Sequence, residues 1–118
     1  MMDTLPLVYQ PLMDGPDIRI GECAVCGRRF PLEQHHYVWR SWGKMFRDGR
    51  EVKKPTITLC GFGNNLRDAD GRYYCHGKAH RRMLHFRYDG ELEYLETDEP
   101  TDYMRALDME GWRCVTSQ

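Results

Sequence analysis

The sequence of 118 residues lacks any run of 18 apolar residues, which excludes a helix long enough to cross a membrane. The start of the chain, MMDTLPLVYQPL, has an acidic residue and no basic stretch, so we expect no secretory signal peptide. Net charge is also nearly absent, at -1 for pH 7, while 41% of the residues are hydrophobic, too many for a disordered tail. The length suits one domain and is too short for two independent cores.

Cysteine is present in an odd number, five, and Cys23 and Cys26 form a tight C-x-x-C. A secreted disulfide scaffold normally pairs all its thiols, so the odd number favours a reducing compartment and a metal site. A redox role for the C-x-x-C is disfavoured because no βαβ pattern surrounds it. Cys114 has no cysteine nearby in the sequence and is expected to be a free thiol.

The small net charge conceals an uneven distribution. Residues 28–87 hold fourteen basic and five acidic residues, a net of +9, whereas 1–27 hold one and four, a net of -3, and 88–118 hold two and nine, a net of -7. A basic centre suits a polyanion such as nucleic acid, because neutralising phosphates releases condensed counterions. An ordinary solvated surface is the alternative interpretation. The candidate phosphate contacts are Arg40, Lys44, Arg47, Lys53, Lys54, Arg81 and Arg82.

The chain divides into an N-terminal arm at 1–22, a core at 23–87 and an acidic C-terminal appendage at 88–118. In chain order we expect a short strand at 18–22, a knuckle at 23–27, a strand at 32–39, an exposed basic loop at 40–55, a strand at 55–59, a surface loop at 61–71, a helix at 76–86, an edge strand at 92–95 and a helix from 100 to about 111. No repeat is present. The pattern predicts an α+β fold.

Four cysteines have spacing typical of a metal site. Two close pairs of sulfur donors bind zinc in a closed tetrahedral shell, which makes such a site structural. Free buried cysteines are the alternative. The predicted ligands are Cys23, Cys26, Cys60 and Cys75.

The histidines form two further pairs in the basic stretch. His35 and His36 are adjacent on a predicted strand, so their side chains point to opposite faces, and one can hold a metal while the other acts differently. His76 and His80 are four residues apart in a predicted helix, which places both imidazoles on one face. His85 lies off that face and is expected at the surface.

These motifs together resemble the HNH endonucleases of the ββα-metal fold, most closely the small zinc-containing HNH proteins of phages and prophages. The resemblance covers residues 23 to about 85 and rests on Cys23-x-x-Cys26-Gly27, Glu33-Gln34-His35-His36, Leu59-Cys60, Cys75-His76-Gly77 and His80. It implies a ββα-metal core with a structural zinc knuckle, followed here by the acidic strand–helix appendage.

The resemblance implies a role for each matched residue. His36 would be the general base that removes a proton from the attacking water, which suits an imidazole with an ordinary pKa near ~6.5. The other histidines of the two pairs would bind the catalytic divalent metal (Mg, Mn, Ni or Zn): His35, His76 and His80. The four cysteines above would hold the structural zinc. Low pH should suppress activity by protonating His36 and the ligand histidines together.

The implied activity is hydrolysis of DNA phosphodiester bonds, by nicking or by double-strand cleavage, in the cytoplasm of a bacterium or a phage-infected cell. The chain departs from the family's pattern at its middle Asn, because 54–58 contain none. Either a loop residue (Asn64 or Asn65) or Thr56 takes its place, or the base is held less firmly.

Two other functions stay open. The chain could be a non-catalytic zinc module that binds nucleic acid with a decayed HNH site. It could instead be a structural or interaction protein that meets a partner protein through the acidic segment 88–118. The interaction-protein alternative predicts no salt-sensitive DNA binding, whereas a basic cleft loses affinity for DNA steeply as the salt concentration rises.

Overall fold

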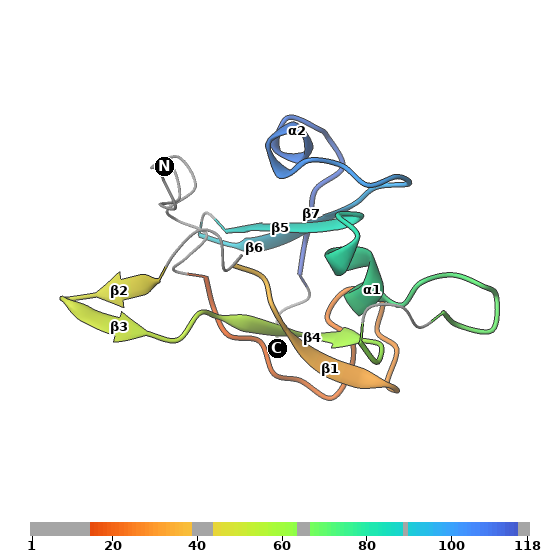
Figure 1. Cartoon of the computed structure of the whole chain (residues 1–118), viewed down its shortest axis with the longest axis horizontal. Helices are drawn as coiled ribbons and strands as arrows, with labels where there is room; N and C mark the ends of the chain where they lie inside the picture. The colour runs from red at the N-terminus through yellow and green to blue at the C-terminus, as the bar shows by residue number, and fades with distance from the viewer. Residues whose placement is uncertain (1–14, 39–43, 64–66, 89, 116–118) are drawn as a thin grey trace.

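The computed structural model describes residues 15–38, 44–63, 67–88 and 90–115. These residues form three antiparallel sheets and two short helices, which confirms the predicted α+β class (Figure 1). The sheets pair β1 (Leu32–His36) with β4 (Thr56–Cys60), β2 (Met45–Arg47) with β3 (Arg50–Val52), and β6 (Leu92–Glu96) with both β5 (Leu84–Tyr88) and β7 (Arg113–Cys114). The helices are α1 (Cys75–His80) and α2 (Tyr103–Leu107).

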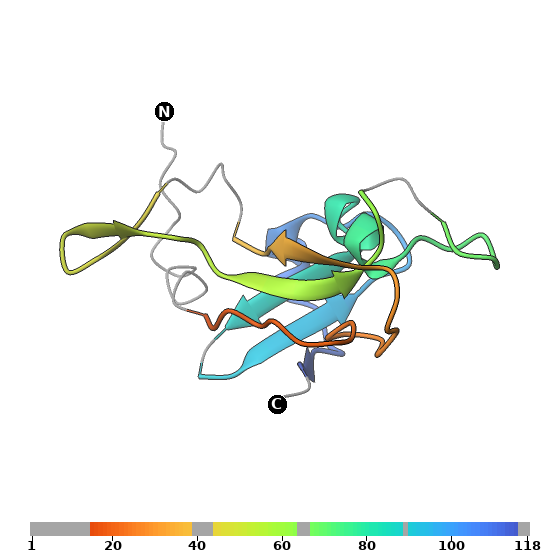
Figure 2. The same ribbon diagram turned by 90° about the horizontal axis from the view of Figure 1, so that it is seen from below.

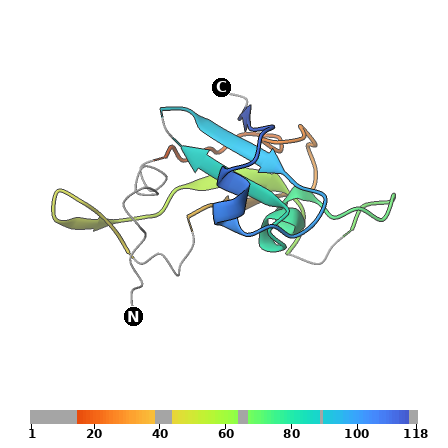
Figure 3. The same cartoon turned by 90° about the horizontal axis from the view of Figure 1, so that it is seen from above.

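The β1–β4 pair and the β5–β6–β7 sheet form two layers, with α1 at one end and α2 over the β5–β6–β7 sheet (Figures 1 and 3). One cluster of buried side chains joins the layers. Ile57 and Leu59 of β4, Ala79 of α1, and Leu84 and Phe86 of β5 are each at most 4% exposed. Burial of a large aliphatic or aromatic side chain stabilises a fold by about 1.5–3 kcal/mol, so this shared core holds α1 against both sheets.

Strand β4 lies between β1 and the N-terminal arm, and its largely apolar sequence TITLC is typical of a buried strand. All five of its residues are buried, and its backbone is paired along both edges, with β1 on one side and the arm on the other. On the arm side, the Ile18 N–H donates to the Thr56 carbonyl at 2.8 Å and the Thr58 N–H donates to the Ile18 carbonyl at 3.0 Å. The strand predicted at 18–22 is therefore reduced to a single bridge with Ile57. The arm's residues 1–14 lie outside the described residues.

The helix predicted at 76–86 is wrong beyond His80. Arg82 adopts a left-handed φ of 59°, which ends the helical path, and β5 begins two residues later. Leu84 and Phe86 alternate into the core in the strand period, and β5 pairs with β6 along its whole length. Tertiary pairing therefore overrides an apolar spacing that also fits a helix.

His85 is also placed differently from the prediction. It is 4% exposed rather than at the surface, and its Nε2 lies 2.8 Å from the Arg82 carbonyl oxygen. Because a carbonyl can only accept, Nε2 carries the proton. Desolvation by burial lowers the pKa of His85, which favours the neutral imidazole. It is a core residue that closes the turn after α1.

The predicted exposed loop at 40–55 contains a hairpin. Strands β2 and β3 pair in register around Asp48 and Gly49, whose φ values are 53° and 80°. Two successive positive φ values are typical of the tight hairpin turn that an Asp-Gly pair favours. The hairpin projects away from the end of the domain that carries α1 (Figure 2).

The acidic segment is integrated with the rest of the domain. Strand β5 runs across the predicted boundary between residues 87 and 88, and β6 pairs on both sides, so the predicted edge strand is a central one. The side chain of Asp102 caps α2 by accepting from the Met104 N–H at 3.1 Å. That helix ends at Leu107, before the predicted end near Gly111. Across the described residues, neither helix has the length or apolarity needed to span a bilayer.

Candidate metal centres

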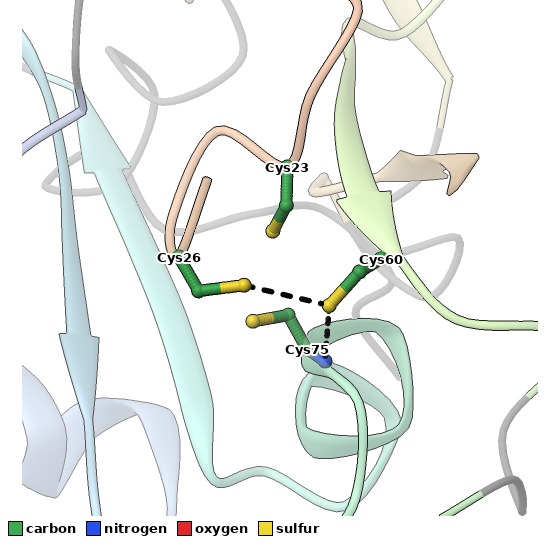
Figure 4. Close-up of side chains that lie close together, drawn as sticks. All are labelled: Cys23, Cys26, Cys60 and Cys75. Carbon is green, nitrogen blue, oxygen red and sulfur yellow. Dashed lines mark hydrogen bonds between the residues drawn. The ribbon is translucent and has the colours of Figure 1, made fainter. Parts of the chain in front are cut away.

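The four predicted zinc ligands meet in space, although up to 52 positions separate them in the chain. Their sulfurs all lie within 4.8 Å of one another and face a common centre (Figure 4). The Sγ atoms of Cys26 and Cys60 are 3.6 Å apart. Zinc–sulfur bonds of about 2.3 Å in a tetrahedron put neighbouring sulfurs about 3.8 Å apart, so the cluster fits a zinc ion. These cysteines could hold a metal such as zinc.

Local structure explains how each cysteine reaches the centre. Cys23 and Cys26 sit in a tight turn in which the Gly27 N–H donates to the Cys23 carbonyl at 2.9 Å. Cys60 ends β4 and Cys75 begins α1, and the Cys75 N–H donates to the Cys60 sulfur at 3.4 Å. The centre therefore ties the knuckle, the end of β4 and the start of α1 together.

The electrostatics of the four sulfurs favour a cation. Hydrogen bonds from neighbouring thiols, that of Cys23 first, lower the pKa of Cys26. Hydrogen bonds to the same neighbours, Cys23 foremost, raise the pKa of Cys75. Thiolates and thiols thus share protons within one small volume, and the cluster titrates as a unit. A divalent cation relieves this competition because it stabilises every sulfur as a thiolate.

Gly61 allows the two chain segments at this centre to approach closely. It has a φ of 133°, and a Cβ added there would lie 3.1 Å from the Cβ atoms of both Tyr74 and His76. A larger residue would push the end of β4 away from the start of α1. The four-cysteine centre depends on that contact, because Cys60 and Cys75 come from these two segments.

Three of the four paired histidines form a second cluster, as the resemblance implies. His35 extends from β1 toward α1, where it meets His76 and His80, and the ligand nitrogens all lie within 4.8 Å of one another. The ring centroids of His35 lie 5.2 Å from those of both other rings, and the Nε2 atoms of His76 and His80 are 3.1 Å apart. Three nitrogens converging on one point are a ligand set that leaves further positions on a metal open.

The half-buried His35 of this cluster has a strongly lowered pKa. Burial, and then the charges of His76 and His80, lower the pKa of His35 to about 3. An unfolded imidazole titrates near ~6.5, so the folded state excludes a proton from His35 between these two pH values. The prediction that acid protonates all the ligand histidines together is therefore wrong for His35.

Glu33 completes the imidazole cluster and was assigned no role from the sequence. Its Oε1 lies 2.7 Å from Nδ1 of His76 and also accepts from the Gly63 N–H at 2.8 Å. Because a carboxylate can only accept, Nδ1 of His76 carries the proton and its Nε2 presents a lone pair to the cluster. A carboxylate behind a ligand histidine fixes its tautomer and raises its basicity. The strand period, which puts Glu33 and His35 on one face, is the sequence signal for this residue.

His36 lies apart from the three clustered imidazoles. It is the last residue of β1 and is exposed, on the opposite face of the strand from His35. Its charge still acts on His35, whose pKa it helps to lower. The adjacent pair thus separates into a half-buried and an exposed imidazole on opposite faces of β1, and the strand spacing predicts the opposite faces.

Thr56 does not supply the donor that the family's middle Asn would provide. It lies opposite His36 in the β1–β4 register, but its Oγ1 donates to Asp17 Oδ1 at 2.7 Å and accepts from Gln34 Nε2 at 3.0 Å. Its only side-chain proton is therefore used by Asp17. The other candidates, Asn64 and Asn65, lie outside the described residues.

The predicted phosphate contacts fall into two groups rather than one. One group lies on or beside the projecting β2–β3 hairpin: Lys44, Arg47, Lys53 and Lys54. The other, Arg81 and Arg82, lies at the end of α1, next to His80. Lys44 is 3.9 Å from Glu51 across the hairpin. Arg40 lies outside the described residues.

Two clusters of metal-ligand type thus share the β1–β4 pair and the first turn of α1. Cys75 faces the sulfurs while its neighbour His76 faces the imidazoles, so one turn of helix serves both. Comparison of the chain with protein-family models, with curated proteins and with solved structures finds no match.

The Glu33 contact gives a testable expectation for metal binding. Loss of the carboxylate behind a ligand histidine costs about 10–100-fold in metal affinity. We expect Glu33→Gln, which keeps the shape but removes the charge, to weaken Mn²⁺ or Ni²⁺ binding by that factor in isothermal titration calorimetry. Glu110→Gln makes the same charge change at an exposed position of the 88–118 segment. Equal affinities in the two variants would rule out a supporting role for Glu33.

Proposed function

We propose that this protein is a metal-dependent DNA endonuclease of the HNH type, with β1, β4 and α1 as a ββα-metal core. The observation that carries the proposal is the convergence of His35, His76 and His80 beside a separate four-cysteine centre. Two antiparallel strands followed by a helix, with ligands on the first strand and the helix, agree with the resemblance drawn from the motifs. The proposed site of action is a reducing cytoplasm.

The imidazole cluster fits a catalytic rather than a purely structural metal site. Three imidazole nitrogens leave open positions on a metal for substrate, and the Glu33 carboxylate orients one of the rings, that of His76. A bound divalent cation supplies charge neutralisation on the phosphoryl oxygens and assistance to the leaving oxygen. His80 is exposed and His76 half-buried, so the open side of the cluster faces solvent, where a DNA backbone can approach.

His36 is the proposed general base. Hydrolysis of a phosphodiester needs a water that loses its proton as it attacks phosphorus, and a neutral imidazole accepts that proton. The exposed position of His36 at the end of β1, next to the ligand His35, leaves it accessible to water and substrate. A cut between phosphorus and the 3′ oxygen leaves a 5′-phosphate and a 3′-hydroxyl, as this family does.

The four-cysteine centre is proposed to be structural. Its four sulfurs fill a tetrahedral shell, and three of its cysteines are buried. With zinc bound, the sulfurs hold the end of β4 against the start of α1, and so keep His35 in reach of His76 and His80.

One observation favours a second candidate, a nucleic-acid-binding zinc module without catalysis. No donor from the described residues holds His36 as the family's middle Asn would, since the Thr56 hydroxyl is engaged by Asp17. A base that is free to rotate is a poorer catalyst, while the basic surface would still bind DNA.

A plasmid-relaxation assay separates the two candidates. We expect the purified full chain to convert supercoiled plasmid to nicked or linear DNA with Mg²⁺, Mn²⁺ or Ni²⁺, and to lose this activity when the divalent metal is withheld. The binding of the same DNA, measured by fluorescence anisotropy, should fall steeply with salt. Salt-sensitive binding without cleavage in any of the three metals would favour the non-catalytic module. Absence of DNA binding would reject both.

A further inference from the structure

One tyrosine next to the imidazole cluster carries two arginines on its ring. The guanidinium carbons of Arg67 and Arg81 lie 4.3 Å and 4.0 Å from the centroid of Tyr73. Arg67 also donates from Nη2 to the Tyr73 hydroxyl at 2.7 Å. Arg67 comes from the loop between β4 and α1, whereas Arg81 follows the last residue of α1, so the fold brings the two cations together from separate segments.

The loop that presents Arg67 and Tyr73 is braced by its own hydrogen bonds. Asp68 Oδ1 accepts from the N–H groups of Asp70 and Arg72 at 2.9 Å and 3.0 Å. Arg67 Nη1 donates to the Gly71 carbonyl at 3.2 Å, and Arg67 forms a bridge with Tyr73. Arg28 of the knuckle lies 3.3 Å from Asp68, which ties the loop to the four-cysteine centre. The position of the stacked cations is therefore set by the fold before any ligand binds.

The stack is close in the chain to the ligands of the proposed metal site. Tyr73 lies three residues before His76, and Arg81 directly follows His80. Arg67 and Arg81 meet on the ring of Tyr73, so both guanidinium groups lie beside α1, the helix that supplies His76 and His80. Tyr73 precedes α1 and Arg81 follows it, so the stack links the two ends of the helix that supplies two of the three imidazoles.

Two like charges held against one ring favour an anion. Stacking on an aromatic ring occupies the face of a guanidinium, while its N–H donors lie around the edge, in the fork geometry that phosphate oxygens accept. The mutual repulsion of Arg67 and Arg81 is relieved when a negative group binds to both. Since the position is preorganised, little side-chain entropy is lost on binding.

We propose that Arg67, Tyr73 and Arg81 form a clamp for a DNA backbone phosphate adjacent to the bond that is cut. The inference rests on the proposed nuclease function and deepens it, because it names the element that sets the position of the strand over the imidazole cluster. The two guanidinium groups bind the phosphate, and Tyr73 holds them in place.

The salt dependence of DNA binding tests the clamp. Each phosphate neutralised on duplex DNA contributes about -0.9 to the slope of log affinity against log salt. We expect Arg67→Ala/Arg81→Ala to reduce the magnitude of this slope by about 1 and to weaken binding on the order of tenfold near physiological salt. Binding is measured by anisotropy of a labelled duplex in the full-length protein without added Mg²⁺, Mn²⁺ or Ni²⁺, so that no cleavage occurs.

Two control variants separate the effect of the clamp from a general loss of positive charge. Arg105→Ala/Arg113→Ala removes the same charge from two exposed positions in the acidic segment, and we expect its slope to stay at the wild-type value. Tyr73→Leu keeps both arginines but removes the ring, and is expected to weaken binding with a smaller change in slope. Zinc content and the far-ultraviolet circular dichroism spectrum of each variant confirm that the fold is intact.

The outcomes distinguish the clamp from the nuclease proposal. Equal slopes in the two double variants would overturn the clamp, whatever the cleavage assay gives. The clamp would also be overturned if polyglutamate, at a carboxylate concentration equal to that of the DNA phosphate, displaced the DNA. The surface would then bind acidic polypeptides as well as it binds DNA phosphate. Lack of cleavage by wild-type protein counts against the nuclease, while a reduced slope in Arg67→Ala/Arg81→Ala alone still supports phosphate binding.

Discussion

Replacement of Cys60 by serine is expected to abolish the cooperative folding of this domain. Cys60 is 1% exposed, and its sulfur lies between Cys26 and the Cys75 N–H. A structural zinc contributes about 10–16 kcal/mol of apparent binding energy at neutral pH. A domain of this size has a net stability of only about 5–15 kcal/mol. Loss of one ligand therefore removes a contribution as large as the whole stability of the fold.

The expectation is checked by metal content and thermal unfolding. Wild-type protein should contain one tightly bound zinc by plasma mass spectrometry and unfold in one cooperative transition. A strong zinc chelator should remove the zinc and abolish the cooperative transition. Cys60→Ser should contain no zinc at the stoichiometric level and show no cooperative transition. Cys114→Ser is the matched control, because Cys114 is an exposed thiol outside the sulfur cluster.

The melting temperature and the binding of Mn²⁺ give two further tests of the zinc site. If Cys60→Ser melts at the temperature of Cys114→Ser and the chelator leaves wild type unchanged, the four sulfurs are ordinary core residues. If zinc is bound, its removal should also weaken Mn²⁺ binding at the imidazoles. Cys75 and His76 are neighbours in the first turn of α1, so the loss of one centre displaces the other.

The ligand residues were predictable because their spacing is a local property of the chain. The period of a strand separates His35 from His36, and the period of a helix aligns His76 with His80, whatever surrounds them. The turn of C-x-x-C fixes the first two sulfurs in the same way. That these local sets come together was inferred only from the resemblance, since no spacing rule links residues so far apart.

The errors arose where distant pairing decides the structure. The apolar residues Ala79, Met83 and Leu84 fit a helical pattern over 76–86, but β6 supplies a partner strand for the residues from Leu84 onward that no local rule reveals. The hairpin at 45–52 lies within the predicted loop, and its Asp48-Gly49 turn is the local hairpin signal in that stretch. The stacking of Arg67 and Arg81 on Tyr73 had no signal at all, because it joins a loop to the far end of α1.

Replacement of His36 by alanine is expected to lower the rate of DNA cleavage by about 10²–10⁴-fold, the contribution typical of a general base. The three clustered imidazoles and Glu33 are untouched by this change, because His36 points from the opposite face of β1. Affinity for Mn²⁺ and for DNA should therefore stay within about twofold of wild type, so that the loss lies in the chemical step.

His35→Ala provides the contrast. It removes a metal ligand from the same strand, so we expect the loss of cleavage to be accompanied by loss of Mn²⁺ affinity in calorimetry, which His36→Ala keeps. A general base acts only as the neutral imidazole, so the wild-type rate should fall as the pH is lowered. Because the pKa of His35 is about 3, this fall cannot come from protonation of His35 unless the pH approaches that value.

The comparison of the two variants decides what His36 does. Cleavage by His36→Ala at the wild-type rate would show that water is activated elsewhere and that the exposed imidazole is only a surface residue. A rate loss that excess Mn²⁺ restores would instead make His36 a contributor to metal binding. A loss that persists at saturating Mn²⁺, with unchanged DNA affinity, assigns the proton transfer to His36, because no other property of the site has then changed.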